Sequence, residues 1–246
     1  MAIILSSFDQ GNAIARQVRL TTLEWPPYVI ADGSGPSTEM VTSVFQRAGL
    51  EIHTQVFPWN RALLLAASSP EWTGLYPEYY AVGEDAEAGG KRCIYSDPFG
   101  TSPVGLLQRK DDPITFRSHA DLRAYVISVV RGYQNEARLD DMISAGEIYV
   151  ELSENDVQTI KMVAGRRVQA GVIDTNVFAY LAERDPAIAA VSGDLEFHPR
   201  LLVTQNLHVC FQNSAEGRAA RDAFNAALSH VSAGTGAGAA TGMGPN

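Results

Sequence analysis

The stretch VRLTTLEWPPYV at residues 18–29 sets the first strand of the chain and the turn that ends it. VRLTT is predicted to form a strand, and the two prolines end it because proline has no N–H for a strand ladder. The stiff turn holds Glu24, Trp25 and Tyr28 at the end of that strand. Aromatic side chains in such a turn either plug a hydrophobic core or form the edge of a binding site.

The composition is that of a globular protein with one or two domains. Of the 246 residues, 46% are hydrophobic and 19% are charged. The net charge of −9, without clusters of Lys and Arg, predicts that nucleic acid is not a partner. No run of apolar residues is long enough to span a membrane.

The sequence lacks the motifs of common catalytic, metal and phosphate sites. Its five histidines are scattered without the spacing of a metal-ligand pair. It has no G-x-S-x-G nucleophile turn and no phosphate loop. We therefore predict no metal, no cofactor and no catalytic residues.

Strand-like and helix-like segments alternate along the chain, a pattern typical of parallel sheets with helices on their faces. In the first part, the predicted segments are a helix at 37–50 with Ser37 as N-cap, a strand at 51–57, a helix at 60–67 and a strand at 73–76. In the second part, they are strands at 103–108, 124–130, 148–152 and 169–173, and helices at 119–123, 134–144, 153–165 and 174–186. Ser153 and Asp156 resemble a capping box that opens the third of these helices.

A strand at 207–211 and an amphipathic helix at 214–231 are predicted near the end of the chain. Both fit as the last elements of the first α/β unit, which then becomes discontinuous. The predicted organisation is lobe 1 at 16–102 plus 203–231, and lobe 2 at 103–202.

The two ends of the chain and the two cysteines complete this prediction. Residues 1–15 are interpreted as added residues or as the remnant of an export signal, and 232–246 as a flexible Gly/Ala-rich tail. Cys93 and Cys210 show no metal or redox spacing. A disulfide between them is one possibility, and the sequence leaves their pairing open.

Several segments, in this order, resemble one known family. They are PPY (26–28), AGL (48–50), PWNRAL (58–63), YSDPFGTSPVGLLQRKDDPI (95–114), ADLRAYVISVVRGYQNEA (120–137) and AGVID (170–174). The chain is similar, over about 16–231, to bacterial extracellular solute-binding proteins of family 3, the amino-acid-type periplasmic binding proteins of ABC importers. The resemblance implies an α/β fold of type II, with two lobes, each a mixed sheet flanked by helices. A two-strand hinge would join the lobes, which close on a small solute.

The resemblance assigns roles to residues of the first turn. It implies that Trp25 covers the ligand, that Thr22 makes a polar contact with it, and that Glu24 and Tyr28 flank the site.

In the second lobe, the turn Arg131-Gly132-Tyr133-Gln134 joins a strand to a helix. Backbone amides near Gly132 and Tyr133, with the Gln134 side chain, suit an anion, and an ordinary strand-to-helix turn is the alternative. The resemblance places at Asp174 the acid that pairs with the ammonium group of a ligand. Asp174 also suits a helix N-cap, and both roles are compatible.

The chain departs from the family at the residues that bind a ligand carboxylate. The family has a T-x-E-R stretch whose arginine forks onto that carboxylate, but the corresponding segment here reads AVGEDAEAGGKRC. Arg92, Lys91 and Arg61 are the candidate replacements. The strand GLYPEYY turns Tyr76, Glu78 and Tyr79 toward the cleft, and this excess of aromatic and acidic groups also suits a cationic or amine-bearing solute.

Taken together, these patterns predict a receptor without catalytic activity. It would act in the periplasm as a monomer, capture a small polar solute (an amino acid or an amine-like molecule) and deliver it to an ABC permease. One alternative is an exported, dehydratase-like enzyme that uses Glu24, Glu78 or another cleft carboxylate as acid or base. Another is a solute-sensing module that signals through a partner.

Overall fold

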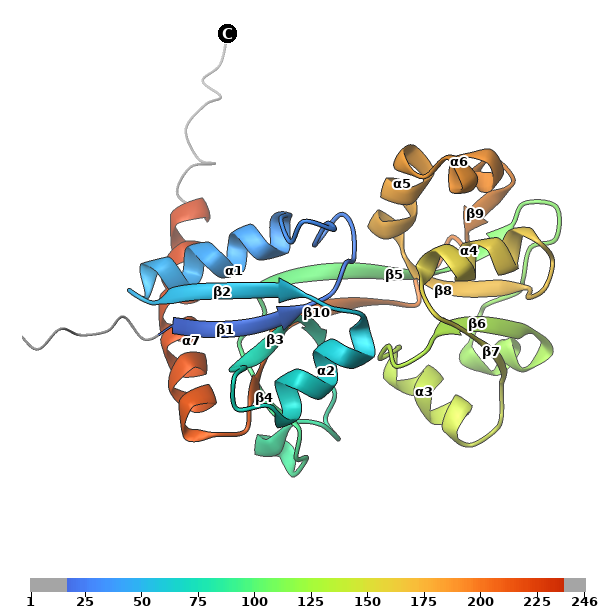
Figure 1. The fold of residues 1–246 in the computed structure, drawn as a ribbon. Coiled ribbons are helices and arrows are strands. Elements are labelled where there is room, and N and C mark those ends of the chain that lie inside the picture. The colour runs from blue at the N-terminus through green and yellow to red at the C-terminus, as the bar shows by residue number, and fades with distance from the viewer. Residues whose placement is uncertain (1–16, 237–246) are drawn as a thin grey trace, which may run out of the picture.

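Two lobes of strands and helices lie side by side, connected by two long strands (Figure 1). The computed structural model describes residues 17–236, with side chains up to His230. The segments at 1–16 and 237–246 lie outside the described residues, and with them the expected N-terminal remnant. The last helix, α7 (Ala215–Gly236), continues through the start of the segment where we expected a flexible tail. Within 17–236, no helix is long and apolar enough to cross a membrane.

The first lobe combines the N-terminal elements with the C-terminal helix. Besides α7, its elements are β1 (Gln17–Thr22), α1 (Pro36–Arg47), β2 (Glu51–Val56), α2 (Trp59–Ser68), β3 (Gly74–Tyr79), η1 (Ala86–Ala88) and β4 (Cys93–Tyr95). The second lobe is formed by the middle of the chain. Its elements are η2 (His119–Ala124), β6 (Val126–Val130), α3 (Ala137–Ser144), β7 (Tyr149–Ser153), α4 (Asp156–Ala164), β8 (Ala170–Asp174), α5 (Thr175–Arg184), α6 (Pro186–Ser192) and β9 (Leu195–Phe197).

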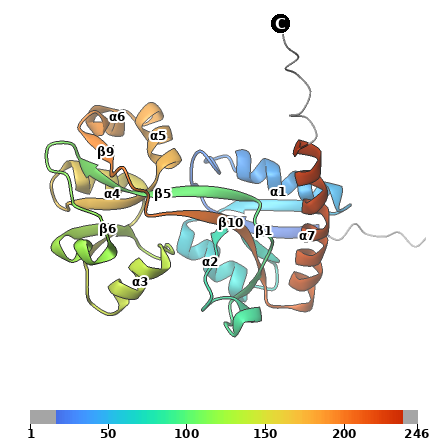
Figure 2. The same ribbon diagram turned by 180° about the vertical axis from the view of Figure 1, so that it is seen from behind.

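The hinge consists of β5 (Gly100–Arg109) and β10 (Val203–Gln212), which run between the lobes (Figures 1 and 2). These strands pair antiparallel within one mixed sheet of order β2-β1-β3-β10-β5-β8-β6-β7. β1 is parallel to β2 and β3 in the first lobe, and β6 is parallel to β7 and β8 in the second. This arrangement confirms the predicted α/β fold with two mixed lobes and a two-strand hinge.

Each lobe has its own hydrophobic core. In the first lobe, α1 and α7 pack against β10, and the rings of Phe45, Phe211 and Phe224 meet. The centroids of Phe45 and Phe224 are 5.1 Å apart. In the second lobe, Leu122 and Ile127 are fully buried among aliphatic side chains of β5, β8 and α3. Each lobe thus has its own core, although Val177 of α5 and the partly buried Tyr133 and Leu181 of the second lobe also pack against the core of the first.

The first helix begins differently from the prediction. Its N-cap is Gly35, and Ser37 lies inside the helix without a capping role, because Pro36 takes the first helical position. Gly35 has a φ of 123°, and an added Cβ would lie 2.6 Å from the carbonyl oxygen of Tyr28. Glycine is therefore required where the aromatic turn passes the start of α1.

Two helices of the second lobe also start differently from the prediction. The helix expected from residue 134 begins at Ala137, because the Glu136 side chain accepts a hydrogen bond from the Leu139 N–H at 2.9 Å and caps it. At α4 the N-cap is Asn155, whose side chain accepts from the Gln158 N–H at 2.9 Å. Asp156 is therefore the first helical residue rather than part of a capping box. The short elements β4, β9 and α6 were not predicted.

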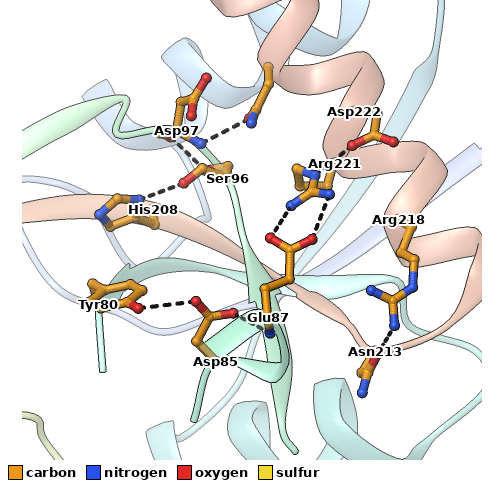
Figure 3. Close-up of polar contacts among 11 residues, drawn as sticks. Tyr80, Asp85, Glu87, Ser96, Asp97, His208, Asn213, Arg218, Arg221 and Asp222 are labelled. Carbon is orange, nitrogen blue, oxygen red and sulfur yellow. Dashed lines mark hydrogen bonds and ion pairs between the residues drawn. The ribbon is translucent and has the colours of Figure 1, made fainter. Parts of the chain in front are cut away.

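Polar contacts fasten α7 to the rest of the first lobe (Figure 3). Arg221 on α7 donates two hydrogen bonds to the carboxylate of Glu87 in η1, at 2.9 and 3.0 Å. Nearby, Nδ1 of His208 on β10 lies 2.7 Å from the carbonyl oxygen of Ser96. The Arg221 contact holds the C-terminal helix against the segment between β3 and β5, and the His208 contact joins β10 to the same segment.

A disulfide joins Cys93 on β4 to Cys210 on β10, which settles the pairing that the sequence left open. The bond lies in the first lobe and spans 117 positions of the chain. It therefore ties a segment before the second lobe to one after it.

We predict that the Cys93→Ala/Cys210→Ala variant loses about 2–5 kcal/mol of unfolding free energy, because the bond closes a long loop. Urea denaturation of the two proteins measures the difference. The wild-type protein under reducing conditions should show the same loss. Equal unfolding free energies for variant and wild type would contradict the prediction.

Candidate functional site

Two small cavities lie between the lobes, where strands of both lobes end. They share the lining side chains of Trp25 and Tyr79 from the first lobe and Tyr133 and Gln134 from the second. Their volumes are about 30 and 20 Å³, which is room for about one water molecule each. The first cavity is also lined by Leu23, Trp59, Pro77 and Glu78, and the second by Asn135, Asp156 and Asp174 together with four valine and isoleucine side chains.

Trp25 is at the centre of this cleft. The aromatic turn folds back on itself, with backbone hydrogen bonds between Trp25 and Val29 in both directions, at 2.8 and 3.1 Å. The indole stacks on the ring of Tyr28 with centroids 4.4 Å apart, and it meets the ring of Tyr79 edge-on. Trp25 is 6% exposed, and its Nε1 has no hydrogen-bond partner among the described residues. Trp25 thus packs in the core and lines both cavities.

Asp174, at the end of β8, caps α5. Its Oδ1 accepts hydrogen bonds from the N–H groups of Asn176 and Val177, at 2.7 and 2.9 Å. Its Oδ2 accepts from the hydroxyl of Tyr28 at 2.8 Å and from the hydroxyl of Ser102. Burial raises the pKa of the Asp174 carboxyl. The N-cap role is therefore present, and the other carboxylate oxygen is directed toward the cleft side of the hinge.

Asp156, at the first position of α4, is a second acid that lines the cleft. It is 7% exposed. Burial, and then the negative charge of Asp174, raise its pKa to about 7. The indole N–H of Trp25 and the hydroxyl of Tyr133 lie beside the carboxyl and favour its charged form. The two acids thus interact electrostatically.

Hydrogen bonds join the described parts of the two lobes beside the cleft, at Trp59 and at Tyr28. Nε1 of Trp59, at the start of α2, donates to the carbonyl oxygen of Gly132 in the second lobe at 2.8 Å. The Trp59 ring also meets the ring of Tyr133 edge-on. At the other place, Tyr28 of the first lobe donates to Asp174 and accepts from Nδ2 of Asn176 at 2.9 Å.

Polar groups of the turn at 131–134 form hydrogen bonds within the turn or to residues on the surface. The Tyr133 N–H donates to the carbonyl oxygen of Val130 at 3.1 Å. The Arg131 side chain is exposed and bonds to Glu154 at 3.0 Å. Because α3 begins only at Ala137, its N-terminus lies beyond the turn. Of the polar side chains proposed here, Gln134 lines the cavities.

Five proposed residues of the first lobe do not line either cavity, namely Thr22, Glu24, Tyr28, Tyr76 and Arg92. The Thr22 hydroxyl donates to the carbonyl oxygen of Tyr76 at 2.7 Å, and the Tyr76 hydroxyl is hydrogen-bonded to that of Thr38, so both belong to the lobe core. Glu24 is exposed and faces a separate groove beside α5. Arg92 bonds to Glu84 at 2.9 Å and lies beside the disulfide.

Glu78 and Tyr79 have different environments although they are adjacent. Glu78 lines the first cavity, but its carboxylate pairs with Arg92 at 3.4 Å, and burial raises its pKa to about 7. The Tyr79 hydroxyl is hydrogen-bonded to that of Ser102 at 2.6 Å, next to Asp174. Tyr79 thus belongs to the group around the cleft acids.

The charge of the cleft is one-sided. Among the described residues that line the two cavities, none is Lys, Arg or His. The described part of the chain also holds no cluster of three or more side chains suited to a metal ion. The arrangement therefore offers carboxylates, hydroxyls and aromatic faces to whatever enters.

The sequence did not single out three residues that the structure brings to this site. Trp59 lies in the PWNRAL segment and Ser102 in the YSDPFGTS segment, both of which carried the family resemblance. Asp156 was taken as a helix cap. The positions of Trp59 and Ser102 in these two segments were their only sequence signal. The contacts that bring all three residues to the site join distant parts of the chain, so local patterns do not reveal them.

Comparison with solved structures supports the class of fold. The GluR0 ligand-binding core from Nostoc punctiforme, in complex with L-glutamate, has a TM-score of 0.68 at 18% identity, over 89% of this chain and 94% of that chain. A histidine kinase sensor domain with similarity to periplasmic binding proteins has 0.73 at 14%, over 90% and 92%. An ancestral amino-acid-binding protein, described as a precursor of cyclohexadienyl dehydratase, has 0.65 at 16%, over 88% and 89%.

These likenesses show that the chain has the two-lobe fold of periplasmic binding proteins. The fold implied by the sequence resemblance is thereby confirmed. No protein-family model and no curated protein matches the chain.

We predict that Asp156→Asn makes the protein more stable near pH 8 and leaves its stability near pH 4 almost unchanged. In the wild type, the unfolded chain releases the Asp156 proton near the ordinary pKa of 3.8, whereas the folded protein keeps it up to about pH 7. Unfolding is therefore increasingly favoured as pH rises through this window. The gain near pH 8 should be on the order of 2–4 kcal/mol, measured by urea denaturation.

Asp141→Asn, at an exposed carboxylate on α3, is the matched control. It should keep the pH dependence of the wild type. An Asp156→Asn variant that loses stability equally at both pH values would contradict the prediction.

We predict that Trp59→Phe shifts the equilibrium between closed and open lobes toward the open form by about 2- to 10-fold. The ring is kept, but the hydrogen bond to Gly132 is lost, which is worth about 0.5–1.5 kcal/mol. Gly132→Ala should act in the same direction, because its φ is 78° and an added Cβ would lie 2.6 Å from Oδ1 of Asn60. Small-angle X-ray scattering reports the opening as a larger radius of gyration. An unchanged radius in both variants would contradict the role of this contact.

Proposed function

We propose that the protein captures a small polar solute, an amino acid or an amine-like molecule, by closure of its two lobes. The observation that carries this proposal is the cleft itself, in which Trp25 and Tyr79 of one lobe and Tyr133, Gln134 and Asp156 of the other line the same small space. A solute that contacts both lobes binds the closed form better than the open form and therefore favours closure.

The size of the cavities limits the solute and requires motion. At about 20 and 30 Å³, neither cavity admits an amino acid while the aromatic rings of Trp25, Tyr79 and Tyr133 stand between them. Entry therefore requires the lobes to part or these rings to turn. Bending at β5 and β10 is the motion that the fold allows with least disturbance of the two cores.

Delivery to an ABC importer in the inner membrane is the role we propose for the captured solute. The disulfide between Cys93 and Cys210 supports a site of action outside the cytoplasm, since such bonds persist in oxidising compartments. The periplasm is the compartment that this role requires, with the receptor acting as a monomer. Binding without catalysis is the simplest use of the cleft.

Two alternatives have support from specific observations. One structural neighbour is a histidine kinase sensor domain, so the same cleft can be placed in a sensing module that signals through a partner. An enzyme is the other, because Asp156 combines a position in the cleft with a pKa of about 7, which suits general acid or base chemistry. Recovery of the solute unchanged after long incubation separates a receptor from an enzyme.

The test is a thermal-shift screen against amino acids, amines and small carboxylates, with scattering to follow closure. We expect at least one solute to raise the unfolding free energy by about 2.7 kcal/mol at a hundred times its dissociation constant. The same solute should decrease the radius of gyration. Tyr133→Ala should abolish both effects, and Tyr149→Ala, which changes a tyrosine that is 77% exposed on β7, should not. If no solute stabilises the protein, the proposal fails.

A further inference from the structure

Two acids, Asp156 and Asp174, line the same cavity without a cationic side chain among its lining residues. Both are buried, at 7% and 3% exposure. They come from different elements, α4 and β8. Buried carboxylates are normally paired with a cation or kept neutral, because a lone charge is costly away from water. Asp174 accepts four hydrogen bonds, but neither acid has a cationic partner among the described residues that line the cavity.

Trp25 supplies a second, independent observation in the same cavity. Its indole Nε1 is buried and makes no hydrogen bond of ordinary geometry, although an unpaired buried N–H costs about 1–3 kcal/mol. The N–H lies beside the carboxyl of Asp156, where it favours the ionised acid. An N–H in this position stabilises Asp156 most when the acid is charged, and a cation in the cavity would favour that state further.

We propose that Asp156 and Asp174 together form a binding site for an organic ammonium ion that carries no carboxylate. The inference rests on the proposed function, since it names the class of solute that the cleft captures. A diamine is the natural probe, because it offers one ammonium group to each acid. The aromatic faces of Trp25, Tyr79 and Tyr133 flank the same space and add cation–π attraction.

The groups that face Asp156 among the described residues include no cation. Around it are Asp174 on β8, the hydroxyl of Tyr133 after β6 and the hydroxyl of Tyr79 on β3. Tyr28 bonds to Asp174 from the aromatic turn. The pKa of each of these tyrosines is raised, chiefly by burial, so all three are neutral at physiological pH. The only charges in this group are therefore negative.

This cleft is unfavourable for a solute carboxylate, because the described residues that line it include acids and no cationic side chain. The candidate arginine of the first lobe, Arg92, is engaged by Glu84 and Glu78 outside the second cavity. In the second lobe, the Tyr133 N–H is used within its own turn. A carboxylate would thus lack a bidentate donor and would stand near two acids. Like-charge contacts of this kind select against a ligand as effectively as attractive contacts select for one.

The test compares 1,4-diaminobutane with L-ornithine, which is the same chain with an added carboxylate, and with 1-aminobutane. Isothermal titration near pH 8 gives the three affinities. We expect one of the two amines to bind at least about tenfold more tightly than L-ornithine. Asp156→Asn should weaken amine binding by at least about tenfold, and Asp141→Asn should leave it unchanged.

A readout besides binding separates this outcome from a folding defect. Asp156→Asn is expected to be at least as stable as the wild type near pH 8, so weaker binding cannot arise from unfolding. Heats measured near pH 6, where the Asp156 carboxyl is mostly protonated, in buffers of different ionisation enthalpy should show protons released on amine binding by the wild type and fewer by the variant.

Tighter binding of L-ornithine than of both amines would overturn the inference and leave the proposed function standing. Amine binding that survives Asp156→Asn unchanged would overturn the role of the acid pair. If none of the three probes binds, the inference also fails, and the wider solute screen then decides the proposed function separately.

Discussion

The antiparallel pairing of β5 with β10 is the constraint on which the rest of the structure depends. Because this pair belongs to both lobes, it sets how the first-lobe strands β1 and β3 stand against the second-lobe strands β6 and β8. The turns that follow β1 and β6 therefore meet across one cleft, with Asp174 at the end of β8 beside them. Closure brings groups that are more than a hundred positions apart in the chain into hydrogen-bond contact.

The resulting cleft contains more acidic and aromatic side chains than folding of the protein alone requires. Burial of Asp156 beside Asp174 works against folding at neutral pH, and no cationic side chain among the described residues that line the cavity offsets it. An electrostatic cost of this kind, located in a cleft between two lobes, is typical of a ligand-binding site. The same closure that desolvates the acids also surrounds them with aromatic faces. The proposed recognition of a cation and the cost of an unpaired buried charge would have the same physical origin.

Much of the fold could be predicted from the sequence, because strand and helix periodicities are local and the order of the motifs resembled one family. The site was harder. Asp156 looked like a cap because sequence shows its helix position but not which way its side chain points. Thr22 and Tyr76 are polar or aromatic residues near a strand end, yet they lie in the lobe core, where the Thr22 hydroxyl donates to the carbonyl oxygen of Tyr76. Trp59 and Ser102 act through contacts between lobes, which no local pattern encodes.

The most direct test of this account is a carboxyl-carbon NMR titration of Asp156 and Asp174, assigned with Asp156→Asn. The account predicts that Asp156 titrates near pH 7 and that the titration shifts to lower pH when an amine fills the cleft. A midpoint near the ordinary value of 3.8 without any solute would contradict it, because the acid would then be neither desolvated nor coupled to Asp174.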